Sequence, residues 1–235
     1  MERPYRPLIV ESPFRQGLRI AGYIFFYPLL FLAVIPFYSL RITGRKRLGI
    51  RGPGITVMNH CIDLEWFFVW HAARPRYIRF VAEEANMKRV DAGWFNWIMG
   101  VIGVPDDRPM AVGSSVKAAL ERGELVHFFP EGVIKRGNQK PSGFIIGAAW
   151  FACLYSVSLI PISEVLLKRP IHRFLPWWPP RVKLIVGEAL NPEDFIKPGE
   201  KMRKGAARMN LAAEHHIRET IKGHRERGQL KSINH

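Results

Sequence analysis

The residue types best suited to acid and base chemistry lie together in GITVMNHCIDLEW, residues 54–66. Asn59 and His60 directly follow an apolar run of the kind that forms a strand, and Asp63 and Glu65 open the next helical stretch. Catalytic residues of α/β sheets favour such strand-to-helix turns. A carboxylate that bonds a histidine orients its ring and stabilises the imidazolium formed when the ring accepts a proton. The segment therefore predicts a general base, His60, with polar residues around it.

Two acids compete for the position beside His60. Each helical residue turns the chain by about 100°, so a side chain five positions on points roughly 140° away, whereas one three positions on lies close. Glu65 therefore requires His60 to stand outside the helix, and Asp63 would serve if His60 were inside it. A purely structural role is the competing interpretation, because Asp and Asn commonly cap helices.

A second polar segment, FFPEGVIKRG, spans residues 128–137. A strand is expected to end there at Glu131 and Gly132, and Lys135 and Arg136 follow in a basic loop. An acid and a glycine at the carboxyl end of a strand, beside two cations, can hold hydroxyl groups and an anion together. Taken alone, this arrangement is also common in loops that bind nothing.

Two shorter segments complete the pattern. In GVIGVPDDR an apolar strand ends at Arg108, which suits either the binding of a phosphate or pairing with Asp106 or Asp107. In LIPIS, Pro161 opens another apolar strand segment. Neither segment identifies a chemistry by itself.

In this order and spacing, the four segments resemble the glycerolipid acyltransferase family, typified by 1-acylglycerol-3-phosphate acyltransferase. The likeness runs from about Val57 to Pro161. It implies a catalytic box of His60 and Glu65, in which Glu65 takes the place of the commoner aspartate. We expect the remaining residues to provide catalytic support (Asn59, Asp63), acceptor binding (Arg108, Glu131, Gly132, Lys135, Arg136) and other motif positions (Asp107, Phe129, Pro130, Pro161).

Two departures from the family pattern concern the acceptor. The threonine and arginine that usually follow Glu-Gly are Val133 and Ile134 here, so a hydroxyl and a cation are absent, and Lys135 or Arg136 would have to compensate. Asp106 stands where an apolar residue normally precedes Asp-Arg, and it brings a negative charge toward the implied phosphate site. The resemblance therefore implies acyl transfer more directly than it implies a phosphate on the acceptor.

The implied function is transfer of a fatty acyl group from acyl-CoA or acyl carrier protein to the hydroxyl of a lysophospholipid, a step of phospholipid biosynthesis. The expected acceptor is 1-acylglycerol-3-phosphate, giving phosphatidic acid, and another lysolipid or lipid alcohol is the alternative. His60 would take the hydroxyl proton during direct attack on the thioester, with no cofactor. A covalent route through Cys61 is the rival mechanism, and a non-catalytic membrane scaffold is the rival function.

No metal centre is expected. His60, Asp63 and Glu65 lack a well-spaced further ligand, and His215 and His216 are adjacent on an expected helix and face different ways. With only two cysteines, the chain can form neither a disulfide scaffold nor a four-cysteine zinc module.

The charge and the aromatic content narrow the class of partner. Thirty-five Lys and Arg against 20 Asp and Glu give a net charge of +15, which favours anionic partners. The 12% aromatic content favours a membrane interface over nucleic acid, because Trp and Tyr settle at that interface. The basic residues are dispersed and no nucleic-acid recognition motif appears, so no nucleic-acid partner is expected.

An uncharged apolar stretch precedes the polar segments, at residues 20–40. As a helix it would be about 30 Å long, which matches the hydrocarbon core of a bilayer. Pro28 and Pro36 lie within it, so we expect a bent or two-piece helix. Basic residues flank both ends, which suits a span, a hairpin or an element lying in an anionic leaflet; a buried helical hairpin of a soluble protein is the remaining alternative. We expect membrane association at the cytoplasmic face, the inner membrane in a bacterium.

Beyond residue 51, short apolar runs alternate with amphipathic stretches, which is typical of an α/β domain. The predicted architecture is a central mixed sheet flanked by helices, with residues 1–51 as a membrane-anchoring or interfacial helical segment and residues 52–235 as the catalytic domain. The expected strands cover 55–58, 78–81, 101–104, 125–129, 159–162 and 182–186, and the expected helices cover 65–73, 90–99, 110–122, 144–155 and about 206–225.

Overall fold

The computed structural model describes residues 13–49, 52–90, 93–105, 107–141, 143–228 and 230. Its strands form one seven-stranded mixed sheet in the order β1-β7-β6-β2-β5-β3-β4, in which only the β6–β7 pair is antiparallel. The strands are β1 (Arg41–Thr43), β2 (Gly54–Met58), β3 (Ile78–Glu83), β4 (Ile102–Val104), β5 (Leu125–Phe128), β6 (Ser158–Leu167) and β7 (Arg181–Val186). The predicted fold class is therefore confirmed.

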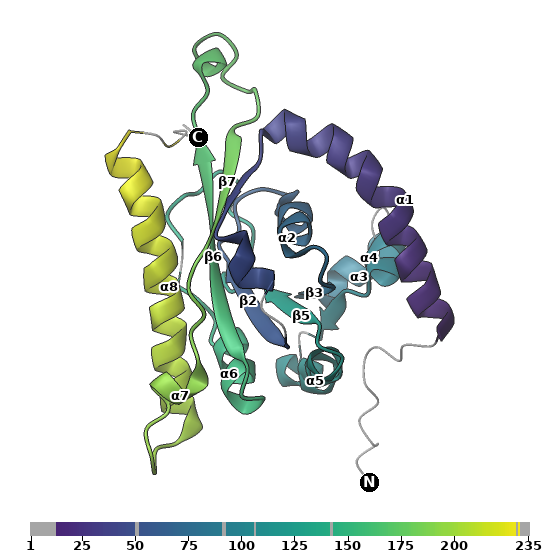
Figure 1. The fold of residues 1–235 in the computed structure, drawn as a ribbon, viewed down its shortest axis with the longest axis vertical. Coiled ribbons are helices and arrows are strands. Elements are labelled where there is room, and N and C mark those ends of the chain that lie inside the picture. The colour runs from purple at the N-terminus through teal and green to yellow at the C-terminus, as the bar shows by residue number, and fades with distance from the viewer. Residues whose placement is uncertain are drawn as a thin grey trace.

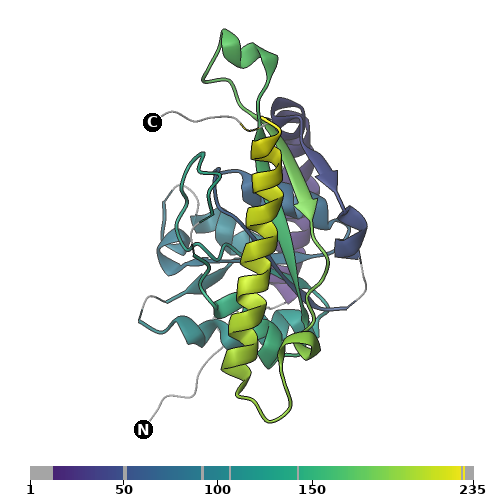
Figure 2. The same cartoon turned by 90° about the vertical axis from the view of Figure 1, so that its left-hand side faces the viewer.

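Helices cover both faces of this sheet (Figures 1 and 2). Helices α5, α6 and α8 share one apolar core with one face, and α1, α2 and α4 share a second core with the other. The helices are α1 (Pro13–Tyr38), α2 (Glu65–Ala73), α3 (Glu84–Met87), α4 (Gly93–Met99), α5 (Gly113–Glu121), α6 (Gly147–Leu154), α7 (Pro192–Phe195) and α8 (Met202–Glu226), with 3₁₀ turns η1 (Arg45–Gly49), η2 (Pro109–Val112) and η3 (Pro170–Arg173).

Strand β2 occupies the middle of the sheet, between the parallel strands β5 and β6. Every residue of β2 is buried, as expected of a parallel strand covered on both faces. Ile55 and Val57 point into the α6 and α8 core, and Met58 points into the α2 core. The carboxyl ends of β2, β5 and β6 consequently open onto one edge of the sheet, where polar residues from three segments can meet.

The predicted strands and the larger predicted helices are present, with α2 at the predicted bounds. Two strands differ from expectation. β6 continues to Leu167, because the polar Ser163 and Glu164 that interrupt its apolar run are themselves fully buried. β1 was not predicted, and it lies inside the segment assigned to the anchor although it pairs with β7 of the catalytic sheet.

The N-terminal helix α1 runs without interruption through both prolines and curves along one side of the molecule (Figure 1). A bent or two-piece helix was expected. One continuous, curved helix forms, and it is neither broken into two pieces nor folded into a hairpin. Among the described helices, only α1 is long and apolar enough to cross a membrane by length and composition, over residues 16–38. Most of that stretch is unburied. Residues 1–12, 50 and 51 of the predicted anchor lie outside the described residues.

One face of α1 is docked onto the catalytic domain. The Tyr23 ring lies edge-on against Trp70 at 4.4 Å between centroids, and the Tyr27 hydroxyl bonds His71 Nδ1 at 2.7 Å. The opposite face exposes large apolar side chains: Ile24, Phe25, Leu29 and Leu32. α1 thus has a packed side and an unpacked apolar side, although its composition is apolar all round.

A buried ionic cluster fixes the beginning of α1. Arg19 Nη2 donates to Glu124 Oε1 at 3.3 Å, and Arg79 bonds both oxygens of the same carboxylate. All three side chains are almost completely buried. Glu124 therefore compensates two guanidinium charges that water cannot reach.

Replacement of Glu124 should destabilise the fold strongly. Glu124→Gln should lower the free energy of unfolding by about 3–5 kcal/mol, because breaking a buried pair leaves an uncompensated charge. The measurement is denaturant unfolding in detergent micelles. Glu121→Gln is the matched control: Glu121 forms an exposed pair with Lys117 at 3.7 Å, and its loss should cost no more than about 1 kcal/mol. Equal effects of the two variants would contradict the proposed weight of the cluster.

Candidate active site

The turn after β2 is held by the amide of Asn59. Its Nδ2 donates to the Glu164 carbonyl at 3.1 Å, and its Oδ1 accepts from the Glu164 N–H at 2.8 Å. The side chain thereby imitates one further backbone pair between β2 and β6. Asn59, which is fully buried, fixes where the strand ends and where the next residue, His60, begins the turn.

His60 bonds Glu65 rather than Asp63. Helix α2 begins at Glu65, with Leu64 at its N-cap position, so His60 stands outside the helix as the Glu65 alternative required. Nδ1 of His60 hydrogen-bonds Oε1 of Glu65. The His60 side chain is about one fifth exposed and the Glu65 side chain is buried. This places a partly accessible imidazole on a fixed, buried carboxyl group.

The Phe-Pro-Glu-Gly segment surrounds His60 from the β5 side. The His60 ring stacks on Phe129 with centroids 4.3 Å apart, and the His60 N–H donates to Glu131 Oε1 at 3.0 Å. The buried Pro130 accepts from the Ile145 N–H at 2.7 Å. Gly132 has φ of +75°, which favours glycine, and an added Cβ would lie 3.1 Å from Ile145. The predicted motif residues are therefore brought together.

The loop after Gly132 lies against the His60 turn through its backbone. The Lys135 N–H donates to the His60 carbonyl at 3.1 Å, and the Gly137 N–H donates to the Cys61 carbonyl at 2.7 Å. The Lys135 side chain is exposed. Segments about 70 positions apart in sequence are thus joined by backbone hydrogen bonds as well as by side chains.

Asp63 and Arg136 form an ion pair that sequence analysis did not predict. Arg136 donates to both oxygens of Asp63, at 2.9 and 2.8 Å, and both side chains are exposed. Asp63 makes no helix cap, since the N-cap residue is Leu64 and no side chain caps the helix. Arg136 hydrogen bonding lowers the pKa of Asp63. The cation expected to bind the acceptor is thus engaged by an acid expected to support catalysis.

Arg108 lies away from this cluster. It follows the edge strand β4, which β3 and β5 separate from β2, about 14 Å at the usual spacing of strands. Its exposed guanidinium pairs with Asp107 at 3.0 Å. Asp106 lies outside the described residues. The structure therefore places Arg108 and Asp107 on the same edge of the sheet as His60, but several strands apart.

Pro161 occupies the interior strand β6, where proline is unusual. It is in register with Val57 of β2, and its carbonyl accepts from the Gly187 N–H at 2.8 Å on the β7 side. The amide nitrogen and the carbonyl of one strand residue point to the same side. The nitrogen of Pro161 therefore faces β7, and no hydrogen bond between β6 and β2 is lost. Proline is therefore tolerated at this motif position.

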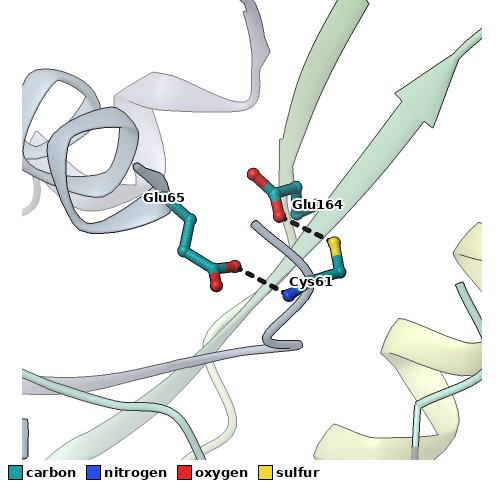
Figure 3. Close-up of side chains that lie close together, drawn as sticks. All are labelled: Cys61, Glu65 and Glu164. Atoms are coloured by element: carbon teal, nitrogen blue, oxygen red, sulfur yellow. Dashed lines mark hydrogen bonds between the residues drawn. The ribbon is translucent and has the colours of Figure 1, made fainter. Parts of the chain in front are cut away.

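Sequence analysis missed Glu164, a fully buried carboxyl group on β6 (Figure 3). Its Oε2 accepts a hydrogen bond from Cys61 Sγ at 2.8 Å, while the Cys61 N–H donates to Glu65 Oε2 at 3.2 Å. Oε1 of Glu164 has no hydrogen-bond partner among the described residues, and the carboxyl groups of Glu164 and Glu65 lie together, with ligand atoms within 4.8 Å of each other. The available signal was an acid inside an apolar strand run just after Pro161.

Two buried carboxyl groups this close cannot both be charged. Burial raises the pKa of Glu65 and of Glu164 well above the usual range, and the charge of Glu65 raises that of Glu164 further. The nearby Glu164 carboxyl and the N–H groups of Cys61 and Ile62 favour the ionised form of Glu65, which lowers its pKa in part. Of the two groups, Glu164 is therefore the better suited to hold a proton, and Glu65 the better suited to carry the charge beside His60.

The thiol of Cys61 is poorly placed for covalent chemistry. Burial raises its pKa well above the ordinary value, with further increases from Glu164 and Glu65, so it stays a thiol. Cys61, Glu65 and Glu164 are also the described residues whose ligand atoms converge within 4.8 Å. A metal ion would need all three groups deprotonated, whereas burial favours the protonated forms of Cys61 and Glu164 and a hydrogen bond already joins these two. The set does not fit a metal centre.

The imidazole of His60 is neutral near pH 7. Burial lowers its pKa below the ordinary value and outweighs nearby carboxylates, among them Glu131 and Asp63, which raise it. A neutral imidazole with Nδ1 bonded to a carboxylate carries its proton on Nδ1 and leaves Nε2 free to accept one. The arrangement can thus remove a proton from a hydroxyl group held beside it.

Comparisons with known proteins agree with this geometry. The model of the family described as Acyltransferase matches residues 39–164. Among solved structures, the fold is similar to the crystal structure of the 1-acyl-sn-glycerophosphate (LPA) acyltransferase PlsC from Thermotoga maritima, with a TM-score of 0.58 and 16% sequence identity over 89% of this chain and 88% of that one. A comparison with curated proteins gave no match.

The charge distribution between Glu65 and Glu164 can be tested by amide substitution. Glu164→Gln should keep the free energy of unfolding within about 1 kcal/mol of the original, because an amide donates and accepts as the protonated acid does. Glu164→Leu should cost about 1–3 kcal/mol, since it leaves buried polar partners unsatisfied. Denaturant unfolding measures both. If Glu164→Gln is as destabilising as Glu164→Leu, the proton is not on Glu164.

Proposed function

The chain belongs to the acyltransferase family, whose model covers more than half of it, and we propose that it transfers a fatty acyl group from a thioester to the free hydroxyl of a lysophospholipid. The proposed acceptor is 1-acylglycerol-3-phosphate and the product phosphatidic acid, with acyl-CoA or acyl carrier protein as the donor. The observation that carries the proposal is the hydrogen bond between His60, which lies outside α2, and Glu65, the first residue of α2.

In the proposed mechanism, His60 acts as a general base for direct transfer. Nε2 takes the hydroxyl proton as the acceptor oxygen attacks the thioester carbonyl, and Glu65 stabilises the resulting imidazolium. The new oxygen-to-carbonyl bond forms, the carbon-to-sulfur bond breaks, and the imidazolium returns the proton to the departing thiolate. Stacking on Phe129 and the bond from the His60 N–H to Glu131 hold the ring and its backbone in place. No cofactor takes part in this scheme.

Two groups of residues support a lipid acceptor. Val133 and Ile145, both exposed, present apolar surface beside Gly132. Lys135, Arg136 and Arg108 supply cations for a phosphate. Arg136 and Arg108 already have carboxylate partners, and Val133 and Ile134 provide no polar side chain, which favours a lysolipid or lipid alcohol without a free phosphate as the second candidate.

We further propose that the enzyme works on the cytoplasmic leaflet of a membrane, with α1 lying in the interface. A spanning helix would be surrounded by lipid, whereas α1 is docked along one side through Tyr23, Tyr27 and the buried Arg19. Its unpacked apolar side suits burial among acyl chains, as in interfacial helices. Basic residues beyond its end, such as Arg41 and Lys46, are exposed and suit anionic headgroups.

The activity is tested by incubating the purified chain with mixed lysolipids and a labelled acyl donor, once as acyl-CoA and once on acyl carrier protein, and identifying the product. His60→Ala should reduce turnover by about 10²–10⁴-fold, and Glu65→Gln should come close to it. Asp63→Asn is the matched control and should keep turnover, because Asp63 contacts Arg136. The mechanism would be contradicted if Asp63→Asn abolished turnover while Glu65→Gln kept it, or if an acyl group were trapped on Cys61. Absence of acyl transfer by the original chain would favour the scaffold, and full activity of both His60→Ala and Glu65→Gln would place the chemistry on other residues.

The pH dependence of turnover should reflect the depressed pKa of His60. A base whose pKa is lowered stays neutral to a lower pH, so kcat/KM should hold through pH 6.5 and fall only below it. Glu131→Gln removes a charge that raises this pKa and should move the decline to still lower pH. The measurement is a pH profile of initial rates. A decline centred above pH 6.5 would exclude a buried neutral imidazole as the base.

The acceptor's charge is tested by changing the cations and their partners. If the acceptor carries a phosphate, Arg108→Ala should raise its apparent KM by about tenfold with donor KM unchanged. Asp63→Ala should lower the acceptor KM, because it releases Arg136 from its ion pair. Asp63→Ala in combination with Arg136→Ala is the control and should lose that gain. An acceptor KM indifferent to all of these changes would point to an uncharged lipid alcohol.

A further inference from the structure

The connection between β6 and β7 projects beyond the rest of the sheet as a hairpin tip, residues 168–180 (Figures 1 and 2). The 3₁₀ turn η3 lies within it. His172 braces the tip: its Nδ1 accepts from the Arg169 N–H at 3.1 Å and its Nε2 bonds the Trp178 carbonyl at 2.9 Å. The projection is therefore an internally bonded structure.

This braced tip exposes two large aromatic side chains. Phe174 is 78% exposed and Trp177 is 73% exposed. Hydration of such apolar surface is unfavourable, by about 25 cal/mol for each Å². Exposed apolar surface of this size commonly marks a contact with another surface. The tip therefore presents a contact surface of aromatic character.

The charge around the aromatic side chains has one sign. Residues 168–181 contain four basic residues and no acid: Lys168, Arg169, Arg173 and Arg181. Three of them are exposed, Arg169 being partly buried. Aromatic rings combined with lysine and arginine are characteristic of elements that lie at the headgroup level of anionic membranes.

The tip is joined to the end of α1. Arg169 Nη2 donates to the Phe37 carbonyl, and the Phe37 and Trp178 rings are 5.5 Å apart. Phe37 itself is partly exposed. The apolar side of α1 and the aromatic tip thus meet at Phe37, so a surface bound by one lies next to the other.

The tip also lies on the side toward which the active site opens. β2 and β6 are parallel, with Met58 opposite Ile162, and β6 continues five residues further to Leu167. At about 3.3 Å per residue this extends roughly 17 Å past the end of β2. The tip is thus farther along the direction in which the chain leaves β2 toward His60.

From these observations we propose that the hairpin tip is a second membrane-binding element, which inserts Phe174 and Trp177 into an anionic leaflet beside α1 and turns the carboxyl edge of the sheet toward the lipid. The proposal rests on the proposed function in one respect, that the acceptor is taken from a membrane. An acidic carrier protein could also contact the basic residues, but it would not require two protruding aromatic side chains.

The test is a site-specific fluorescent label on the full chain. Both native cysteines are buried, so Trp177→Cys offers an accessible thiol for an environment-sensitive dye. Vesicles of phosphatidylcholine with phosphatidylglycerol should shift the emission to the blue, and nitroxides on the lipid acyl chains should quench it. Leu211→Cys, at an exposed position on α8, is the control and should show neither change. Because α1 remains in both variants, the signal reports insertion of the tip rather than attachment of the protein.

Several outcomes separate the tip from the activity. A label at position 177 that stays in water on vesicle-bound protein overturns the proposal, and so does a shift produced by acyl carrier protein but not by vesicles. The double variant Phe174→Ser with Trp177→Ser tests the orienting role. The proposal is supported if this variant acylates a vesicle-borne acceptor severalfold more slowly but a soluble short-chain acceptor at the original rate. An unchanged rate on vesicles overturns the orienting role. Label insertion needs no turnover, so an inactive protein that still inserts would refute the proposed function alone.

Discussion

Two buried carboxyl groups that lie side by side set the chemistry at the end of β2. Glu65 and Glu164 are both withdrawn from water, and only one of them can carry a charge. Glu65 is the better suited to carry it, because N–H groups of the turn donate to its carboxyl group and the His60 ring is bonded to it. The side-chain amide of Asn59 holds β6 beside the turn, which keeps the two carboxyl groups together. The orientation of the imidazole follows from these contacts.

Local pattern predicted the elements and placed His60 between two candidate acids, the resemblance to the acyltransferase family favoured Glu65, and long-range pairing followed from neither. The α2 start at Glu65 was readable from apolar spacing, and that start by itself forces His60 outside the helix. By contrast, Asp63 meets Arg136 and Cys61 meets Glu164 only because β5 and β6 flank β2. A strand order is not encoded in any short segment. The place of Glu164 in the site could not be predicted from its residue type either. An acid after an apolar run suggests that the strand has ended, unless a buried partner for the acid is known.

The ion pair of Asp63 and Arg136 connects catalysis and recognition through one loop. The loop is fixed to the His60 turn by backbone bonds, so its cations can exchange partners without moving the base. Arg136 can leave Asp63 for an anionic headgroup at the surface, where ion pairs are weak. Selectivity for the acceptor can therefore change through exposed side chains while the buried pair beneath them remains the same.

The docking of α1 determines how a water-soluble form of this protein can be made. Deleting the helix would uncover Trp70 and its neighbours and would remove Arg19 from the carboxylate of Glu124, so a truncated chain would expose new apolar surface and aggregate. The outward side chains Ile24, Phe25, Leu29 and Leu32 contribute little to that packing. Replacing them with polar residues leaves the inner face of the helix in place. A form of the protein that stays in solution without detergent therefore requires polar substitutions on the outer side of α1, not deletion of the helix.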